Sequence, residues 1–272
     1  MADGHYVANV NSHYSRGNIE TAVLDMLTSM GKESGVLTPE ELAPIDQFHI
    51  GGRDATLALA ERAGITASMR ILDVGGGLGG PARTLAATYG CTVTVLDLTE
   101  AYCQVGAMLT ARTGLSDLVT FDNGNALAMP YASGAFDLVW TQHSSMNIED
   151  KGKLYAEIAR VTKPKGRLAI HEIMAGPEQP VQYPLPWARD ASISFLWAPT
   201  PIRELLAMLG YREIVWDDLT DRSPAALRPP APITTPGLEL IAGADFPERA
   251  ASLRKNFAEN RLALIRAVLA LT

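Results

Sequence analysis

A glycine-rich loop and two aspartates stand where this sequence could hold a ligand. The segment ILDVGGGLGGPAR, residues 71–83, begins with a short apolar run and has five glycines between positions 75 and 80. Asp73 lies two residues before the first glycine, and Asp97 ends a second apolar run, TVTVLD, 24 residues later. Glycine lets a ligand approach the backbone closely, and an acid at the tip of a second strand is well placed to accept both hydroxyls of a ribose.

The residues around the glycines indicate which ligand this is. A phosphate-binding loop would continue with Gly-Lys-Ser or Gly-Lys-Thr, whereas this one ends in GGPAR. A dinucleotide would bring its pyrophosphate close to the Asp73 carboxylate, which disfavours an NAD-dependent oxidoreductase. That carboxylate suits an ammonium or sulfonium group, and the polar turn GNALAMP could meet an adenine amino group. Together these segments predict a nucleoside with a cationic tail, which is S-adenosyl-L-methionine.

The elements that must position these residues follow a regular pattern from Arg70 onward. Short β-rich runs alternate with amphipathic helical segments, which predicts a parallel sheet with helices on both faces. We therefore expect an α/β fold with a Rossmann-like, seven-stranded, mostly parallel sheet. The expected strands are RILDVGG, TVTVLDL, VTFDNGNA, FDLVWTQHS, RLAIHEIM, YREIVWDDL and GLELIAG.

The regions on either side of this alternation have other patterns. Residues 1–65 contain three helical patterns and no convincing strand, and we interpret them as an N-terminal helical cap over the active site. Residues 66–272 are the expected core, with a proline-rich insertion at about 176–200 on the substrate side. A final helix is expected from Glu248 to about Leu271. Its apolar face could pack on the sheet of the same chain or on a second subunit, and the second alternative predicts a homodimer.

The composition and net charge of the chain favour a small molecule as its binding partner. The chain has 272 residues, 47% of them hydrophobic, and a formal net charge of −7. This charge argues against nucleic-acid binding and against an anionic membrane surface, both of which need a basic face. We see no apolar run long enough for membrane insertion and no secretion signal at the N-terminus. The two cysteines, Cys91 and Cys103, suggest buried thiols in a reducing cytoplasm rather than a disulfide or a metal cluster.

Four segments of the chain carry a resemblance to a known family. ILDVGGGLGG, VLDLT, GNALAMPYASGAFDLVW and KPKG resemble the successive motifs of class I S-adenosylmethionine-dependent methyltransferases. DQFHIGG and WTQHSSMNIEDK resemble the small-molecule group, which includes sarcosine/dimethylglycine N-methyltransferases, tocopherol methyltransferases and quinone-ring C-methyltransferases. The resemblance covers roughly residues 45–220. It implies methyl transfer from S-adenosyl-L-methionine to a small molecule, with S-adenosyl-L-homocysteine as product and no metal.

The resemblance also assigns the residues that would hold the cofactor. It places the first glycines under the methionine part with Asp73 near its amino group, Asp97 on the ribose, and the turn after the third strand over the adenine. The family usually has Asp where this chain has Asn125, so here an amide oxygen would accept from the adenine amino group without charge assistance. The full set is Asp73, Gly75, Gly76, Gly77, Asp97, Leu98, Thr99, Asn125, Ala126, Leu127, Gln142 and His143.

Four side chains are candidates for catalysis. His143 follows the fourth strand beside the donor methyl group, as a base or as a residue that only packs or binds the cofactor. His49, in FHIGG, either lines the site or is an exposed cap residue. Tyr14, in HYSRG, resembles a tyrosine that many of these enzymes fold across the methyl group. Glu172 ends the fifth strand, where it is either the counter-charge of a cationic substrate or a solvated acid.

The acceptor itself is less constrained by the sequence. Its candidate contacts are Met146, Asn147, Trp187, Phe195 and Trp197, although the aromatic residues of the insertion could instead pin that loop to the domain. Trp140 is expected in the core. The sequence slightly favours a small amine, which needs positioning more than a base. The alternatives are O- or C-methylation of a phenolic or quinone-like ring with a histidine base, and a partner or sensor that binds the cofactor without transferring its methyl group.

Overall fold

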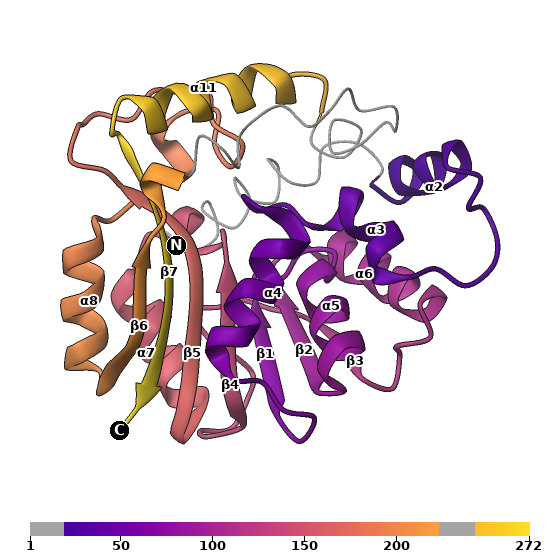
Figure 1. Ribbon diagram of the computed structural model, residues 1–272, viewed down its shortest axis with the longest axis horizontal. Helices are drawn as coiled ribbons and strands as arrows, with labels where there is room; N and C mark the ends of the chain where they lie inside the picture. The colour runs from indigo at the N-terminus through magenta and orange to yellow at the C-terminus, as the bar shows by residue number, and fades with distance from the viewer. Residues whose placement is uncertain (1–18, 223–242) are drawn as a thin grey trace.

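The computed structural model describes residues 19–222 and 243–272, and from Arg70 onward its strands and helices alternate as predicted (Figure 1). One element differs in type from the prediction: residues 262–271 form strand β7, where the sequence predicted a continuation of the final helix. The bounds are α2 Ile19–Ser29, α3 Pro39–Asp46, α4 Gly52–Ala63, β1 Arg70–Val74, α5 Gly80–Tyr89, β2 Thr92–Asp97, α6 Glu100–Arg112, β3 Val119–Asn123, β4 Phe136–Gln142, η1 Ser145–Asn147, α7 Lys151–Val161, β5 Thr162–Ala175, η2 Ala191–Ile193, α8 Pro199–Met208, β6 Tyr211–Asp218, η3 Thr220–Arg222, α11 Phe246–Ala258 and β7 Leu262–Leu271.

The strands form one seven-stranded sheet in the order β3-β2-β1-β4-β5-β7-β6. β1 to β5 pair in parallel, and β7 runs antiparallel between β5 and β6. The chain goes from β1 outward to β2 and β3 and then returns to place β4 on the other side of β1. This reversal leaves a crevice at the carboxyl ends of β1 and β4, where open α/β sheets bind their ligands.

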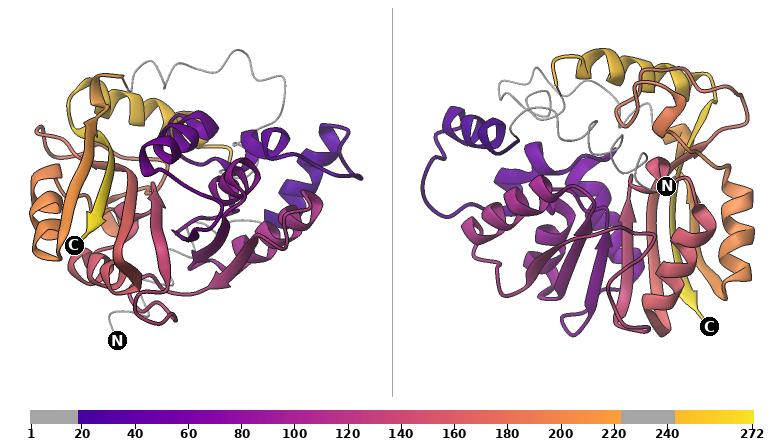
Figure 2. Two further views of the ribbon diagram at one scale, coloured as in Figure 1. Left: turned by 60° about the horizontal axis from the view of Figure 1, so that its bottom comes forward. Right: turned by 180° about the vertical axis from the view of Figure 1, so that it is seen from behind.

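Helices cover both faces of the sheet, as the alternation predicted. α4 and α5 pack on one face, where Leu59 and Leu85 meet Ile71 of β1. α7 and α8 pack on the other face, around Leu72 of β1, and they come into view when the molecule is seen from behind (Figure 2). Successive residues of β1 thus enter opposite cores. Because α4 packs directly on the sheet, the last part of segment 1–65 belongs to the core layer.

The end of the chain differs from the prediction. A single helix was expected from Glu248 to about Leu271, but α11 ends at Ala258 and Leu262–Leu271 is strand β7. Asn260 has a φ of 54°, a left-handed turn that separates the two elements. The run LALIRAVLAL is almost wholly buried between β5 and β6, and an apolar run without alternation does not distinguish a buried strand from a helix. The expected strand GLELIAG falls almost entirely on residues outside the described ranges.

Two distant segments lie together over the carboxyl edge of the sheet. The insertion after β5 and helix α11 meet at the upper side of Figure 1. Gln182 and Asn256 exchange hydrogen bonds, from the Gln182 backbone N–H to Asn256 Oδ1 and from Asn256 Nδ2 to the Gln182 carbonyl, each 2.8 Å. We call residues 181–189 together with residues 245–258 the roof, because they cover the crevice.

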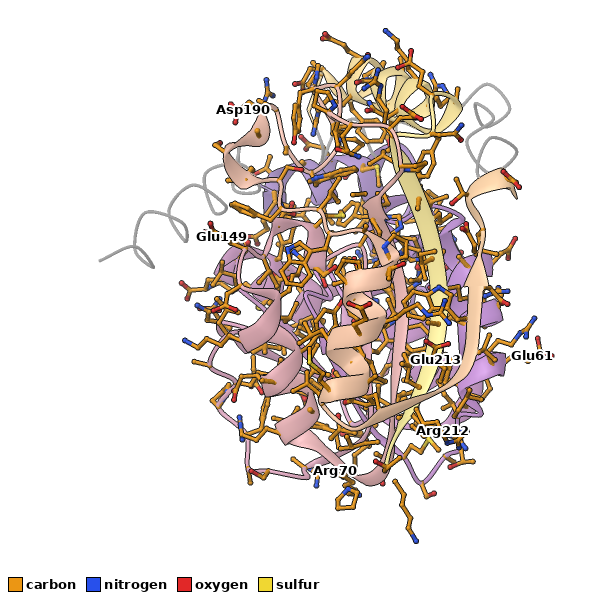
Figure 3. All side chains as sticks on the ribbon, turned by 90° about the vertical axis from the view of Figure 1, so that its left-hand side faces the viewer. Glu61, Arg70, Glu149, Asp190, Arg212 and Glu213 are labelled. Atoms are coloured by element: carbon orange, nitrogen blue, oxygen red, sulfur yellow. The ribbon has the colours of Figure 1, made fainter. Side chains whose placement is uncertain are left out.

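The opposite flank of the molecule is a charged sheet edge. Figure 3 shows Arg212 and Glu213 on β6, the outermost strand. Glu213 accepts two hydrogen bonds of 2.7 Å from the guanidinium of Arg203 on α8. Charged side chains on an edge strand discourage pairing with another sheet, so this flank has a structural role, away from the crevice.

Candidate functional site

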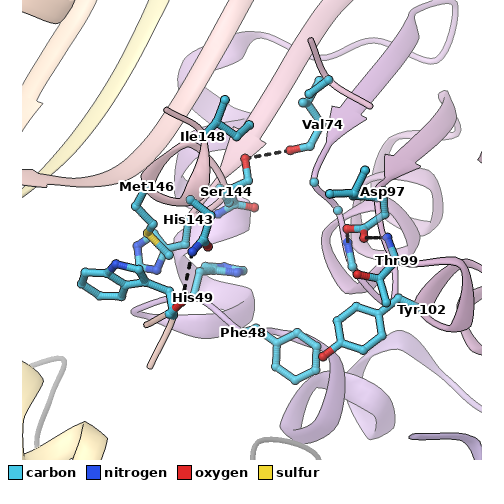
Figure 4. Close-up of a pocket in the computed structure, with 18 of the residues that line it drawn as sticks. Phe48, His49, Val74, Asp97, Thr99, Tyr102, His143, Ser144, Met146 and Ile148 are labelled. Atoms are coloured by element: carbon cyan, nitrogen blue, oxygen red, sulfur yellow. Dashed lines mark hydrogen bonds between the residues drawn. The ribbon is translucent and has the colours of Figure 1, made fainter. Parts of the chain in front are cut away.

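A cavity of about 270 Å³ occupies the crevice at the carboxyl ends of β1 and β4. Its walls come from the turns after β1 to β4, from the segment after α3 and from the roof. In Figure 4, Asp97 and Thr99 stand on one side, and Met146 and His143 on the other. The rings of Phe48 and Tyr102, with centroids 6.3 Å apart, lie along the rim between them.

The glycine loop presents backbone to this cavity because there is no room for side chains. Gly75 has a φ of 71°, and a Cβ on it would lie 2.5 Å from Cβ of Ser144. A Cβ on Gly76 would lie 2.6 Å from Oδ2 of Asp73. Gly75, Gly76 and Gly77 all line the cavity, as predicted for a loop beneath a ligand. Only glycine fits the first two positions without a shift of their neighbours.

Asp73 is a buried carboxylate that faces the cavity without a partner. Its residue is 1% exposed, and among the described residues nothing hydrogen-bonds to Oδ2. Burial, reinforced by the nearby charge of Asp97, raises its pKa to about 8. An acid in this state is stabilised by a cationic ligand, which would supply both the missing hydrogen bond and the counter-charge. The residue thus fits the ammonium group of the predicted cofactor.

Asp97 is held rigidly at the end of β2. Its Oδ2 accepts from the Gly77 backbone N–H at 2.8 Å and its Oδ1 from the Thr99 backbone N–H at 2.9 Å. Burial raises the pKa of Asp97, and these backbone hydrogen bonds oppose the rise. Each oxygen retains a second lone pair. The carboxylate is therefore fixed beside Leu98 and Thr99, which also line the cavity, in a position that suits two ribose hydroxyls.

The turn after β3 is organised by Asn125. Its Oδ1 accepts from the Leu127 backbone N–H at 2.8 Å, which shapes the turn and leaves one lone pair of the amide oxygen. Asn125 and Ala126 line the cavity. Leu127 differs from the prediction that it covers the adenine, because its side chain packs in the core around α7 instead.

His143 is partly buried at the other side of the cavity, in a neutral state. Its backbone, at a φ of 49°, donates from N to the His171 carbonyl at 3.0 Å. The His143 and His171 rings stack with centroids 5.2 Å apart, and His49 stands edge-on 6.0 Å from His143. Burial and these two imidazoles lower the pKa of His143 well below its usual value. Nε2 of His143 has no hydrogen-bond partner among the described residues, so it is an acceptor or donor for a ligand.

His49 lines the cavity from the cap side. Because His49 is buried and lines the cavity, the alternative that it is an exposed residue of the cap is wrong. Its Nε2 lies 2.9 Å from the Gly52 carbonyl, which fixes that nitrogen as the protonated one, and burial lowers its pKa to about 3. Gln142 lines the cavity too, and its Oε1 accepts from the indole of Trp140, which lies in the core as predicted. Both side chains are thus oriented by bonds on the side away from the ligand.

Glu172 is neither a substrate contact nor a solvated acid in this structure. It is fully buried beneath the cavity and is absent from its lining. The carboxylate accepts from Thr141 Oγ1 and from the backbone N–H groups of Ser144 and Ser145. These hydrogen bonds fix the position of the loop that follows His143. The sequence predicted that Glu172 ends the fifth strand, but β5 continues to Ala175, and no pattern in the sequence indicates which way the side chain turns.

The predicted acceptor contacts divide into two groups. Met146, Asn147 and Trp187 line the cavity, whereas Phe195 and Trp197 do not. Asn147 also pins the insertion, since its Nδ2 donates to the carbonyls of Trp187 at 3.0 Å and Ile193 at 2.8 Å. Phe195 and Trp197 lie beside a second, much smaller cavity on the far side of Met146, so they pin the loop rather than form the acceptor pocket. Tyr14 lies outside the described residues.

Several lining residues were missed by the sequence analysis. Some of them are next to predicted site residues in the sequence, so the neighbouring motif could have indicated them. Others belong to the roof, where the sequence has no motif that indicates a binding site. Asp46 is of the first kind: it pairs with the buried guanidinium of Arg83 at 2.8 Å, which in turn donates to the Leu78 carbonyl inside the glycine loop. The missed residues include Asp46, Phe48, Tyr102, Ser144, Ile148, Pro186, Arg189, Phe246 and Arg249.

Comparison with known proteins finds similarity to methyltransferases. Residues 72–170 match the family described as methyltransferase domain. The chain is 36% identical over 166 residues to a glycine/sarcosine/dimethylglycine N-methyltransferase of Actinopolyspora halophila, which covers 61% of this chain and 29% of that relative. It is 41% identical over 100 residues to a probable chloroplastic tocopherol O-methyltransferase of Oryza sativa subsp. japonica, covering 37% of this chain and 28% of that relative. The chain thus spans less than a third of either relative.

A solved structure extends the likeness over the whole chain. The geranyl diphosphate C-methyltransferase of Streptomyces coelicolor A3(2) superposes with a TM-score of 0.72 at 16% identity, over 98% of both chains. At this identity the match shows the fold, and it confirms the Rossmann-like prediction. Within residues 19–222 and 243–272, there is no helix of the length and hydropathy that membrane crossing requires, and no group of three or more potential metal ligands.

Proposed function

Because the chain carries a methyltransferase domain, we propose that it transfers the methyl group of S-adenosyl-L-methionine to a small-molecule acceptor and releases S-adenosyl-L-homocysteine. The observation that carries this proposal is Asp73, a buried carboxylate without a partner in the described chain, which faces a cavity of nucleoside size. A phosphate-bearing ligand is disfavoured at such a carboxylate, whereas the ammonium group of the methionine part satisfies it.

The cavity offers a complementary surface to each part of this cofactor. The backbone of Gly75 to Gly77 would lie beneath the methionine chain, and the fixed carboxylate of Asp97 would accept from the ribose hydroxyls. Asn125 and Ala126 would face the adenine. The ring of Tyr102 and the side chain of Leu98 add apolar contact at the same end. These assignments direct the sulfonium toward His143 and Met146, on the opposite side of the cavity.

When bound, the cofactor supplies an activated methyl group for in-line displacement. The protein then has to align the acceptor with that methyl group and exclude water. The roof and the His143–Met146 loop fulfil both roles, because they close the cavity over the sulfonium end. Glu172 supports this alignment from below by its hydrogen bonds to the backbone of Ser144 and Ser145.

We propose a small amine as the acceptor. An amine reacts through its free lone pair, so it must be unprotonated in the pocket. The described lining residues on the His143 side include no carboxylate that would stabilise a protonated amine, which favours the neutral amine. The unpartnered Nε2 of neutral His143 can accept from its N–H. This reasoning replaces the counter-charge that the sequence analysis had assigned to Glu172.

O- or C-methylation of a phenolic or quinone-like ring is the second candidate, favoured by the same histidine. His143 lines the cavity, and its Nε2, which has no hydrogen-bond partner among the described residues, could take a proton from a ring hydroxyl. Its strongly lowered pKa, however, makes it a weak base toward a phenol, so the amine is the better match. The names of the matched relatives include both N- and O-methyltransferases, and the superposed structure is a C-methyltransferase.

The proposal is tested by the release of S-adenosyl-L-homocysteine from the purified protein. One acceptor set contains glycine, sarcosine and dimethylglycine, and the other contains phenols and quinols. Turnover with the amine set alone supports the proposal, and turnover with the ring set alone assigns the function to the second candidate. Binding of the cofactor without transfer to any acceptor would instead indicate a partner subunit or sensor. A cytoplasmic location and a homodimer remain predictions of the sequence.

A further inference from the structure

We propose that Arg189 and Arg249 form a site for an anionic group of the methyl acceptor, so that the substrate is an amine that also carries a carboxylate or a phosphate. This inference rests on the proposed function, whose acceptor it specifies. The two arginines come from different segments of the roof, the insertion and α11, and both line the cavity. They meet through one carboxylate, that of Asp245.

Arg249 is the buried member of the pair. Its residue is 3% exposed, and its guanidinium donates to the Pro186 carbonyl at 2.8 Å and to Asp245 Oδ1 at 3.2 Å. These bonds orient the guanidinium at the cavity wall. A cation fixed in this way is preorganised for an anion.

Arg189 is the exchangeable member. Its side chain is 42% exposed and pairs with Asp245 Oδ2 at 2.6 Å. Asp245 is itself 26% exposed, so this pair is close to solvent and contributes little free energy. An anionic group entering the cavity can therefore compete with Asp245 for the Arg189 guanidinium at little cost. Among the described residues, the guanidinium groups of Arg189 and Arg249 share the carboxylate of Asp245.

The carboxylates of the cavity wall favour an acceptor whose anionic group lies at the roof. Its described carboxylates, Asp46, Asp73 and Asp97, lie on the glycine-loop side, where Asp46 is already paired with Arg83. An anion entering the cavity is therefore repelled from the cofactor end and attracted to the roof. An acceptor that binds its anionic group at the roof extends its amine toward His143 and the methyl donor. Arg189 and Arg249 thus select an acceptor that carries a negative charge, and they orient its amine nitrogen toward the methyl donor.

The test uses matched pairs of acceptors that differ in one charge. Sarcosine is compared with sarcosinamide, and phosphoethanolamine with ethanolamine, by calorimetric titration into the full-length protein saturated with S-adenosyl-L-homocysteine. We expect the anionic member of at least one pair to bind about tenfold more tightly than its neutral partner. A preference in the first pair identifies a carboxylate, and a preference in the second identifies a phosphate. Equal or undetectable binding within both pairs overturns the proposal.

Variants test whether the preference for the anionic acceptor arises from Arg189 and Arg249. Arg189→Gln should reduce the preference severalfold, and Arg249→Gln should remove it. Because Arg249 is buried and its loss could disturb the roof, Asp245→Asn provides a second readout. That variant releases both guanidinium groups and is expected to tighten binding of the anionic partner. Arg254→Gln, on an exposed position of the same helix, is the control and should leave the preference unchanged. Weaker anion binding in Asp245→Asn would contradict the proposed competition.

The same titrations separate this inference from the proposed function. Binding of S-adenosyl-L-homocysteine, measured first in the same protein, depends on the glycine-loop end and should be the same in the control Arg254→Gln as in the original protein. Bound cofactor product without an anion preference would remove the inference and leave methyl transfer standing. Failure to bind S-adenosyl-L-homocysteine would remove both.

Discussion

The two ends of the cavity are built on different physical principles. The glycine-loop end consists of backbone and of short carboxylates, among which Asp97 is fixed by backbone hydrogen bonds from Gly77 and Thr99. The other end consists of side chains: Met146 from the turn after β4, and Trp187, Arg189 and Arg249 from the two roof segments, whose arginines are about 60 residues apart in the chain. One end is a rigid polar cradle, and the other is a surface of adjustable side chains.

This difference indicates how the molecule divides its tasks. A cradle of backbone and short acids recognises one ligand and tolerates no side chain at Gly75 or Gly76. A roof of long side chains can change its acceptor without disturbing the sheet beneath it. Mutations at the first end should therefore act on cofactor affinity by large factors, and mutations near the roof should act on turnover or on acceptor choice.

The largest effect is expected from Gly75→Ala. The added Cβ would lie 2.5 Å from the Ser144 side chain, at a φ of 71° that already disfavours alanine. We expect binding of S-adenosyl-L-homocysteine to weaken by about 100-fold, measured by calorimetry. Gly152→Ala is the control, because this glycine lies in the first turn of α7 with no contact below 3.4 Å, and its affinity should equal that of the original protein. A small loss in Gly75→Ala would contradict the close-packed cradle.

Asp73→Asn separates the fit to the ligand from the stability of the fold. The asparagine cannot balance an ammonium group, so cofactor-product affinity should fall about 10- to 100-fold. The ligand-free protein should gain stability at the same time. The carboxyl has a pKa of about 8 when folded against 3.8 as its ordinary value, so folding favours its protonated form. Its destabilising effect therefore develops as the pH rises from about 4 to 8.

Thermal melts of the ligand-free protein across this pH range give the second half of that experiment. The original protein should lose melting temperature toward pH 8 more steeply than Asp73→Asn, and the variant should melt higher at pH 8. Parallel curves would mean that Asp73 has a counter-charge within the protein, and the argument for a cationic ligand would then fail.

His143→Gln has a smaller expected effect, on turnover with an amine acceptor. The imidazole is neutral because burial lowers its pKa, so it contributes a hydrogen bond and no titrating base. We expect kcat to fall about tenfold or less, with an unchanged pH–rate profile between pH 6 and 9. A base would be shown by a loss of about 100-fold or more together with the loss of an ascending pH limb. That result would support the second candidate function.

The smallest effect is expected from Asn125→Asp. The carboxylate would keep the hydrogen bond to the Leu127 backbone N–H, now 2.8 Å long, and would add charge assistance toward the adenine amino group. We expect cofactor-product affinity to rise about two- to fivefold. Calorimetry at neutral pH measures it, and an unchanged or weaker affinity would place the adenine away from this turn.

The sequence predicted the cradle because its residues follow consecutive strands. In a parallel sheet the carboxyl ends of these strands meet at one edge, so Asp73, Asp97 and Asn125 had to lie together once the alternation was recognised. The roof could not be predicted in this way. Arg189 and Arg249 have no common motif, and their meeting depends on α11 ending at Ala258 so that β7 can enter the sheet. The apolar run 262–271 suits either a helix or a buried strand, and only its pairing with β5 and β6 decides.

Side-chain direction was the other limit. Glu172 lies in the last part of β5 and His143 directly follows β4, yet Glu172 turns beneath the loop and His143 lines the cavity. Alternation along β5 fixes the face on which Glu172 lies, but the hydrogen bonds of Ser144 and Ser145 that capture it belong to a loop of irregular geometry. Phe195 and Trp197 were ambiguous for the same reason, because a proline-rich insertion has no periodicity from which to infer burial.

The most direct test of the central claim is a competitive calorimetric comparison of S-adenosyl-L-homocysteine with NAD on the original protein. The account predicts that S-adenosyl-L-homocysteine binds to one site, that NAD neither binds nor competes, and that binding near pH 7 releases a proton as Asp73 acquires its counter-charge. Binding of NAD, or binding of S-adenosyl-L-homocysteine that Asp73→Asn leaves unchanged, would contradict it.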